Sequence, residues 1–95
     1  MKRDQARMII RRIAEFGDII ISEGHATKRR IERRFTTQDA LRVLLVGKLV
    51  EEPKDRDEGF ECAMEGQLDD GRTLKVPIIV NDDEDYIIVK SFVRK

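Results

Sequence analysis

One histidine and a row of arginines are the residues of this chain best suited to chemistry on a phosphate. His25 is the only histidine, and five basic residues lie between positions 28 and 34. If this segment is helical, His25, Arg29 and Arg33 lie four residues apart on one face. Arginine can hold phosphate oxygens through two parallel hydrogen bonds, and histidine can transfer a proton near neutral pH. The spacing therefore predicts His25 as a proton-transfer group and Arg29 and Arg33 as phosphate clamps.

Arg30 and Arg34 form a neighbouring row on the same predicted helix, and we expect them to contact a substrate. Glu32 is the only acid among these basic residues. Like charges at this spacing repel each other by a few tenths of a kcal/mol per pair, which a bound anion would offset. Two plainer interpretations remain open: the arginines are a solvated helix face, and His25 is a helix cap.

A second cluster of positive charge is expected in the last hairpin. If residues 81–84 form the loop between the last two strands, Lys75 faces Lys90 across the strand pair. Two lysines directly opposite are unfavourable unless an anion or an acid lies between them. We therefore predict that Lys75 and Lys90 stabilise charge at the same site. The alternatives are a different register and a glutamate from another strand.

The elements that must position these residues fall into two halves. Apolar residues recur at helical spacing between Asp4 and Gly17, from His25 to Arg34, and between Thr36 and Gly47, with a short strand or extended link at 18–21. Thr36 and Asp39 have the spacing of a capping box.

The second half alternates apolar and polar residues at 60–65, 74–80 and 86–93, as half-buried strands do, after a short strand that stops at Pro53. Asp69-Asp70-Gly71 indicates a hairpin turn. Pro77 is expected at a bulge or an edge. The chain is thus predicted to be a single α+β domain over residues 1–95, with helices followed by a four-strand antiparallel meander in two layers.

Charge is distributed unevenly along a chain whose net charge is zero. Residues 1–48 carry twelve Lys or Arg and six Asp or Glu, a net +6, whereas residues 49–95 carry seven and thirteen, a net −6. Such polarity suits an anion on one surface and a basic partner, or only solvent, on another. The overall neutrality argues against indiscriminate binding to duplex DNA.

Several classes of site are excluded. Cys62 is the only cysteine, so it forms no internal disulfide, and one cysteine with one histidine does not make a usual zinc site. We expect Cys62 to be a small buried residue, and we expect no metal and no cofactor. No apolar stretch has the length of a signal peptide or a membrane span, so a cytoplasmic protein is expected, without membrane contact.

The segment HATKRRIERRFTTQDALRVLLVGKLVEE resembles a bacterial and archaeal domain-of-unknown-function family. The sequence motif of that family is HA-x-x-R-x-x-x-R, followed by hydrophobic-Ser/Thr-x-x-Asp, an apolar helix and a glycine. The matching residues are His25, Ala26, Arg29, Arg33, Phe35, Thr36, Asp39 and Gly47. That family is grouped with the RelE-like and barnase-like small nuclease toxins and is often encoded beside a zinc-finger antitoxin. The resemblance implies a RelE-like or barnase-like toxin fold.

The end of the chain, TLKVPIIVNDDEDYIIVKSFVRK, resembles the close of the mRNA-interferase toxins of the motility quorum-sensing regulator type. Lys75 and the Ser91-Phe92 pair match. Thr73 stands where the catalytic tyrosine of those toxins is expected. The lysine expected after the Ser-Phe pair is Val93, and Arg94, which follows it, is expected to contact substrate.

Together these features predict an RNA-binding and RNA-cleaving toxin of a toxin–antitoxin pair. The ribose 2′-hydroxyl can act as nucleophile, so such an endoribonuclease needs no metal, only a proton-transfer group and cations around the phosphate. The expected partners are RNA and a cognate antitoxin, and the resemblance points to an antitoxin of zinc-finger type. The alternative is a protein- or RNA-binding module of the same fold without catalysis.

Overall fold

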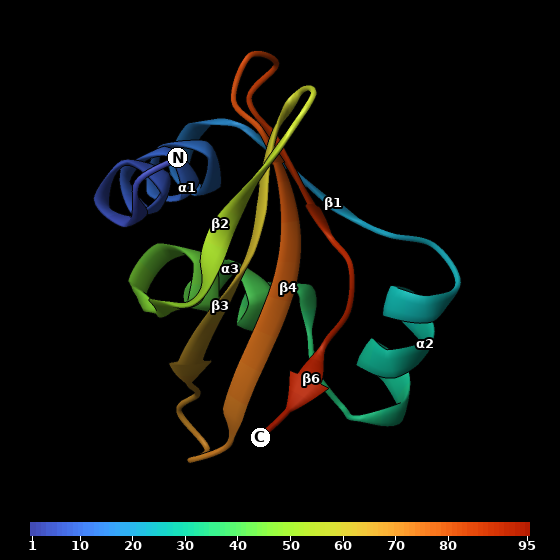
Figure 1. Cartoon of the computed structure of the whole chain (residues 1–95). Coiled ribbons are helices and arrows are strands. Elements are labelled where there is room, and N and C mark those ends of the chain that lie inside the picture. The colour runs from blue at the N-terminus through green and yellow to red at the C-terminus, as the bar shows by residue number, and fades with distance from the viewer.

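The computed structural model describes residues 1–95 as three helices and a six-stranded sheet (Figure 1). The helices are α1 (Arg3–Phe16), α2 (His25–Glu32) and α3 (Thr37–Val46). The strands are β1 (Asp18–Ile21), β2 (Lys48–Arg56), β3 (Gly59–Gln67), β4 (Thr73–Asn81), β5 (Tyr86–Val89) and β6 (Val93–Arg94). The predicted α+β class is therefore confirmed.

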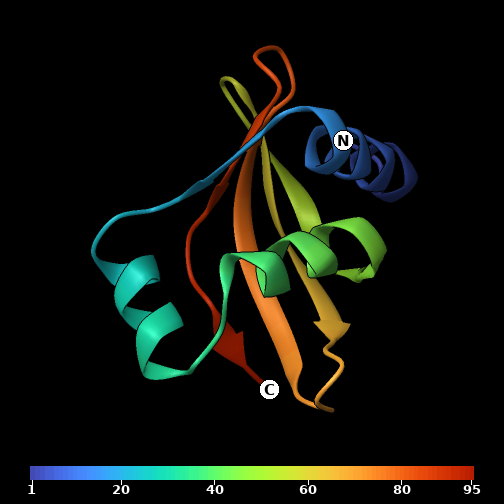
Figure 2. The same cartoon turned by 180° about the vertical axis from the view of Figure 1, so that it is seen from behind.

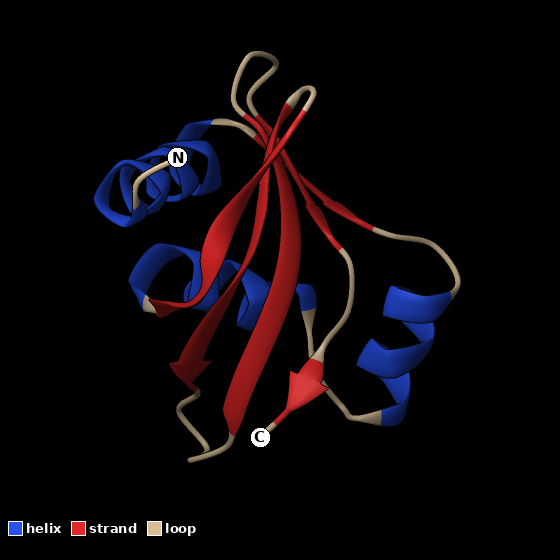
Figure 3. Ribbon diagram, viewed as in Figure 1, coloured by secondary structure: helices blue, strands red, loops and turns tan.

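The sheet is open and mostly antiparallel. Its strand order is β1-β5-β4-β3-β2, and β6 pairs with β4 beside the end that β5 does not reach (Figure 3). Only β1 runs parallel to its neighbour, with Ile20 beside Ile88 of β5. The expected four-strand meander does not describe this sheet, because β1 adds a parallel edge and the end of the chain adds a sixth strand.

Helices α1 and α3 cover one face of the sheet, as Figure 2 shows from behind. They place a stripe of small and branched apolar residues against the strands, the pattern of helices that bury one side. The core includes the helix residues Ala6, Ile10, Ile13, Ala14, Ala40, Val43 and Leu44, the strand residues Phe60, Met64, Leu74, Val76, Ile78, Val80, Ile87 and Val89, and the loop residues Phe35, Leu68 and Phe92. The opposite face of the sheet carries no helix.

Helix α2 lies apart from the other two helices, beside the part of the sheet that ends in β6 (Figure 1). Only Ala26 is buried in it, because its apolar edge is narrow. The helix is short and rich in arginine, so its position depends on the contacts made at its ends. None of the three helices has the length and hydrophobicity that a membrane-spanning helix requires.

The two prolines explain where the strands differ from the expected ones. Pro53 lies inside β2, which does not stop there, because β2 is an edge strand and its register shifts between Glu51 and Lys54. Pro77 lies in the inner strand β4, so of its two expected positions, a bulge and an edge, the edge is wrong. Proline has no N–H to donate, and opposite it the last strand is interrupted: β5 ends at Val89, and β6 resumes with a register shifted by one residue.

The start of α3 follows the sequence closely. The hydroxyl of Thr36 accepts a hydrogen bond from the Asp39 N–H at 3.0 Å, and the Asp39 carboxylate accepts one from the Thr36 N–H at 2.8 Å. The predicted capping box is confirmed. It fixes the first turn of α3 directly after the chain leaves α2.

Candidate functional site

The end of α2 turns sharply and brings two arginines to the surface. Arg33 is the residue after the last helical turn, and Arg34 follows with a φ of 57°. This left-handed conformation reverses the chain, so that Phe35 enters the core while Arg34 stays exposed. The Phe35 ring stacks on Phe92 with a centroid distance of 6.1 Å. The packing of Phe35 on Phe92 thus fixes the segment that carries Arg33 and Arg34.

Arg72 joins this turn to the hairpin between β3 and β4. Its Nη1 donates to the backbone carbonyls of Arg33 and Arg34 at 3.0 and 3.1 Å. Its Nε donates to the carboxylate of Asp70 at 2.7 Å, and its guanidinium lies 4.6 Å from the centre of the Phe35 ring. Arg33 adds a further hydrogen bond between this turn and the end of the chain, since its Nη1 donates to the Phe92 carbonyl at 2.6 Å.

These contacts frame a hollow of about 470 Å³ that opens to solvent. Its lining contains no apolar residue and consists of Glu32, Arg33, Arg34, Asp70, Arg72 and Arg94. We call it the arginine hollow. It joins three segments far apart in the sequence, namely the end of α2, the β3–β4 hairpin and β6.

The charges of the arginine hollow are only partly balanced. Asp70 is occupied by Arg72, whose hydrogen bonds through backbone and side chain hold the pKa of Asp70 below its usual range. Glu32 is occupied by Lys28 and Arg29 within α2. Arg33, Arg34 and Arg94 make no salt bridge with any acid. Three guanidinium groups are thus left to attract an anion.

His25 lies at the opposite end of α2. Arg33 is eight positions further along the chain, which corresponds to about 12 Å along a helix axis. Gly24, not His25, is the N-cap, so the interpretation of His25 as a helix cap is wrong. The imidazole is exposed and does not line the hollow. The structure therefore does not bring His25 together with the arginines of the hollow.

Two other arginines of α2 are engaged in local contacts. Arg29 pairs with Glu32 at 3.3 Å, one turn further along the helix. Arg30 donates to the backbone carbonyl of Phe35 at 3.4 Å and helps to close the end of α2. Neither lines the arginine hollow. Of the predicted site residues, the structure gathers only Arg33, Arg34 and Arg94 at one place.

Lys75 and Lys90 do not face each other. The β4–β5 hairpin pairs Asn81 with Tyr86 and Ile78 with Val89, two residues away from the register expected from the sequence. The loop spans residues 82–85, one position later than expected, and it ends at Asp85, whose φ of 53° turns the chain into β5. A different register was one of the two open alternatives, and it is observed.

Both lysines are paired with glutamates from other strands. The Nζ of Lys75 lies 2.5 Å from Glu51 of β2, and the Nζ of Lys90 lies 3.9 Å from Glu61 of β3. Lys75 alternates with the buried Leu74 and Val76, so it points to the sheet face that α1 and α3 leave uncovered. The lysines and the arginine hollow thus belong to different surfaces.

Arg72 is the site residue that the sequence did not reveal. It lies in the acidic half, and its partners Arg33 and Arg34 are 39 and 38 residues away. A single signal was available: Asp70 and Arg72 flank the predicted hairpin turn at Gly71, where a side chain can reach back to the turn.

No cluster of three or more His, Cys, Asp or Glu side chains could hold a metal ion. The hollow can instead bind an anion through guanidinium groups.

The model of a family described as domain of unknown function (DUF4258) matches residues 22–91. This range includes α2, α3 and the strands up to β5, and Arg94 lies just beyond it. No curated protein and no solved structure matches the chain.

Proposed function

We propose, for a chain that belongs to the DUF4258 domain family, that the protein binds RNA by holding a backbone phosphate in the arginine hollow. The observation that carries the proposal is the group of three guanidiniums, on Arg33, Arg34 and Arg94, that converge without a carboxylate partner. Guanidinium forks match the geometry of phosphate oxygens better than lysines do. Exposed arginines of this kind are an ordinary means of binding a single strand by its backbone.

We further propose that the protein is one of the RelE-like and barnase-like toxins. The sequence resemblance supports this class, and an α+β architecture with helices on one side of a mostly antiparallel sheet is in keeping with it. In this class the partner is an antitoxin. We expect the antitoxin to cover the arginine hollow with carboxylates, since a competitor for phosphate must offer negative charge to the same guanidiniums.

A charge-reversal experiment tests RNA binding. Arg34→Glu with Arg94→Glu changes two exposed side chains that make no hydrogen bond, so the fold should be kept. Lys2→Glu with Lys48→Glu is the matched control, because both lysines are exposed and unpaired and the net charge changes equally. Fluorescence anisotropy of a labelled single-stranded RNA should show at least about a tenfold loss of affinity in the first variant. Equal losses in both variants would mean that the hollow has no special role.

RNA cleavage is a second candidate function. It is favoured by the exposure of His25, whose imidazole is not used as a cap and is free to exchange a proton with a bound ribose. A strand held in the arginine hollow would have to run along α2 to reach it. Incubation of RNA with the protein, with and without ribosomes, followed by gel analysis of the fragments, tests this candidate separately from binding.

A further inference from the structure

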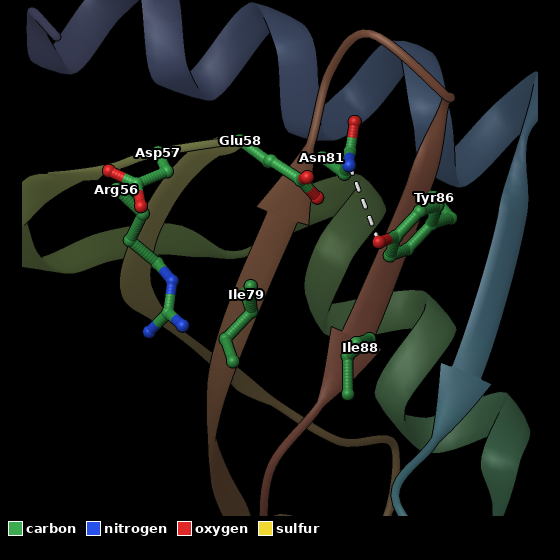
Figure 4. A pocket seen from close by; sticks show the side chains of 7 residues that line it. All are labelled: Arg56, Asp57, Glu58, Ile79, Asn81, Tyr86 and Ile88. Atoms are coloured by element: carbon green, nitrogen blue, oxygen red, sulfur yellow. Dashed lines mark hydrogen bonds between the residues drawn. The ribbon is translucent and has the colours of Figure 1, made fainter.

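The end of the molecule where the hairpin tips meet carries an open pocket unrelated to the arginine hollow. It lies on the sheet face without helices and has a volume of about 570 Å³. Figure 4 shows its floor, made by Ile79 of β4 and Ile88 of β5, which are direct neighbours in the sheet. Ile20 of β1 continues this row beside Ile88 and is 47% exposed. Three isoleucines thus form an apolar strip that no element covers.

One wall of the pocket is fixed by hydrogen bonds. Asn81 is 3% exposed; its amide donates to the Tyr86 hydroxyl at 3.3 Å, and its oxygen accepts from the Glu84 N–H at 2.9 Å (Figure 4). Both the turn and the aromatic ring are therefore held in place. Because Asn81 donates to the tyrosine oxygen, the phenolic proton of Tyr86 remains available to an acceptor such as a peptide carbonyl.

The rim of the pocket is acidic. Asp57 and Glu58 come from the β2–β3 turn, which packs against β4 because Gly59 lies against the Val80 carbonyl. The neighbouring β4–β5 turn holds three more acids, which do not line the pocket itself. None of the five has a salt-bridge partner: Asp57, Glu58, Asp82, Asp83 and Glu84.

The basic residues near the pocket do not balance this charge. Arg56 lines the pocket but pairs with Glu61 at 2.8 Å. Arg12 of α1 pairs with Asp85 at 2.8 Å and leaves the other acids of that turn free. The rim therefore repels phosphate and attracts positive charge.

We infer that this pocket is a docking site for a basic peptide segment that carries apolar side chains. The apolar residues of the segment would lie on Ile79, Ile88 and the Tyr86 ring, and its lysines or arginines would face the two hairpin turns. Charge complementarity selects this occupant over a nucleic acid, and the uncovered isoleucines select it over a plain basic tail. The site is independent of RNA binding at the arginine hollow.

The test uses a synthetic peptide, Lys-Lys-Leu-Lys-Lys-Phe-Lys-Lys, and NMR spectra of the isoleucine methyl groups and the single tyrosine ring. We expect saturable shifts at Ile79, Ile88 and Tyr86. Affinity should fall at least about tenfold when serine replaces the leucine and phenylalanine of the peptide. A peptide with glutamate in place of lysine should not bind.

Variants of the protein test whether the carboxylates of the rim bind the peptide. Asp57→Asn with Glu58→Gln should weaken binding by about tenfold, whereas the control Asp4→Asn with Glu15→Gln on α1 removes the same charge and should leave it unchanged. Equal weakening in both variants, shifts spread over other acidic surfaces, or a Kd weaker than about 1 mM would overturn the inference. Shifts of the same three residues on addition of oligouridylate would overturn it too, in favour of a nucleic-acid surface.

Discussion

The guanidinium of Arg72 lies 4.6 Å from the centre of the Phe35 ring and donates to the two carbonyls just before it, those of Arg33 and Arg34. A single side chain of the β3–β4 hairpin thus holds the turn that presents the arginine hollow. Arg72, which comes from the acidic half of the chain, thus provides the donor for two backbone carbonyls at the end of α2.

Arg72→Ala should destabilise the protein by about 2–3 kcal/mol, because it removes a cation–π contact and two hydrogen bonds to backbone carbonyls. Arg72→Lys should lose nearly as much, since an ammonium lacks the planar fork that reaches both carbonyls. Urea unfolding followed by circular dichroism measures the difference. Arg94→Ala is the control and should change stability by less than about 0.5 kcal/mol. Similar values for the Arg72 and Arg94 variants would contradict the role assigned to Arg72.

RNA binding should weaken steeply with salt. Contact with about four phosphates of a single strand gives a slope of about −3 in log K against log salt. Arg34→Ala with Arg94→Ala should reduce the slope to about −1.5, because two phosphate contacts are lost. Lys2→Ala with Lys48→Ala should leave it unchanged. Anisotropy titrations at several salt concentrations give the slopes, and a flat response of the unchanged protein would exclude phosphate contacts as the basis of binding.

Local features of this fold could be predicted from the sequence, whereas contacts between distant segments could not. The capping box of Thr36 and Asp39 lies within four residues, so its chemistry is complete in the sequence. Arg33 and Arg34 were identified by their density of charge. Arg72 was missed because its partners come close only after the β3–β4 hairpin folds beside α2.

Lys75 and Lys90 show a second limit on prediction from sequence, which concerns the register of paired strands. Moving the four-residue β4–β5 loop by one position shifts the register by two residues and moves Lys90 away from Lys75. Every buried residue keeps its face, since strand side chains alternate with a period of two. The apolar pattern is therefore satisfied by both registers. What distinguishes them is the turn, in which Asn81 accepts from the Glu84 N–H and Asp85 adopts a positive φ. Neither feature is visible in the hydrophobic pattern.

Gly59→Ala should cost more than about 2 kcal/mol of stability. Gly59 has a φ of 135°, which other residues rarely adopt, and an added Cβ would overlap the Val80 carbonyl oxygen. Gly71→Ala is the matched control: its φ of 90° is also positive, but open space surrounds the position of the new Cβ. Thermal unfolding of the two variants separates the overlap from the backbone strain. If Gly71→Ala is the more damaging change, the close packing of the two hairpins is not what Gly59 provides.

Cys62 should be an unreactive core residue. Burial, reinforced by the negative charge of Glu51, raises the pKa of the Cys62 thiol to about 12. At pH 8 the folded protein should therefore resist alkylation by iodoacetamide, while the unfolded chain reacts. Cys62→Ala should cost about 1–2 kcal/mol as a modest truncation in the core. Rapid alkylation of the folded protein would show that the thiol is accessible.

The same pKa shift gives a pH dependence with a definite sign. The folded state keeps the proton of Cys62 up to about pH 12, whereas the unfolded thiol loses it near its ordinary pKa of about 8.5. The unfolded state thus binds fewer protons above that pH, and stability should fall as pH rises, by up to about 1.4 kcal/mol per unit. Below pH 8 the thiol is protonated in both states, so Cys62 causes no loss of stability there. The difference in unfolding free energy between the unchanged protein and Cys62→Ala, measured from pH 8 to 10, isolates it from other titrating groups.

His25→Ala separates the two candidate functions. The imidazole is exposed, is not the cap of α2 and does not line the arginine hollow, so its removal should change stability by less than about 0.5 kcal/mol and leave RNA affinity unchanged. If the protein cleaves RNA with His25 as its proton-transfer group, the rate should fall by about 10²–10⁴-fold at equal affinity. Binding, cleavage and thermal unfolding are measured on the same preparations, with Lys28→Ala on the next helical turn as control. Equal cleavage by the two folded proteins would remove His25 from the reaction, and an unchanged protein that binds RNA without cutting it would identify the arginine hollow as a binding site alone.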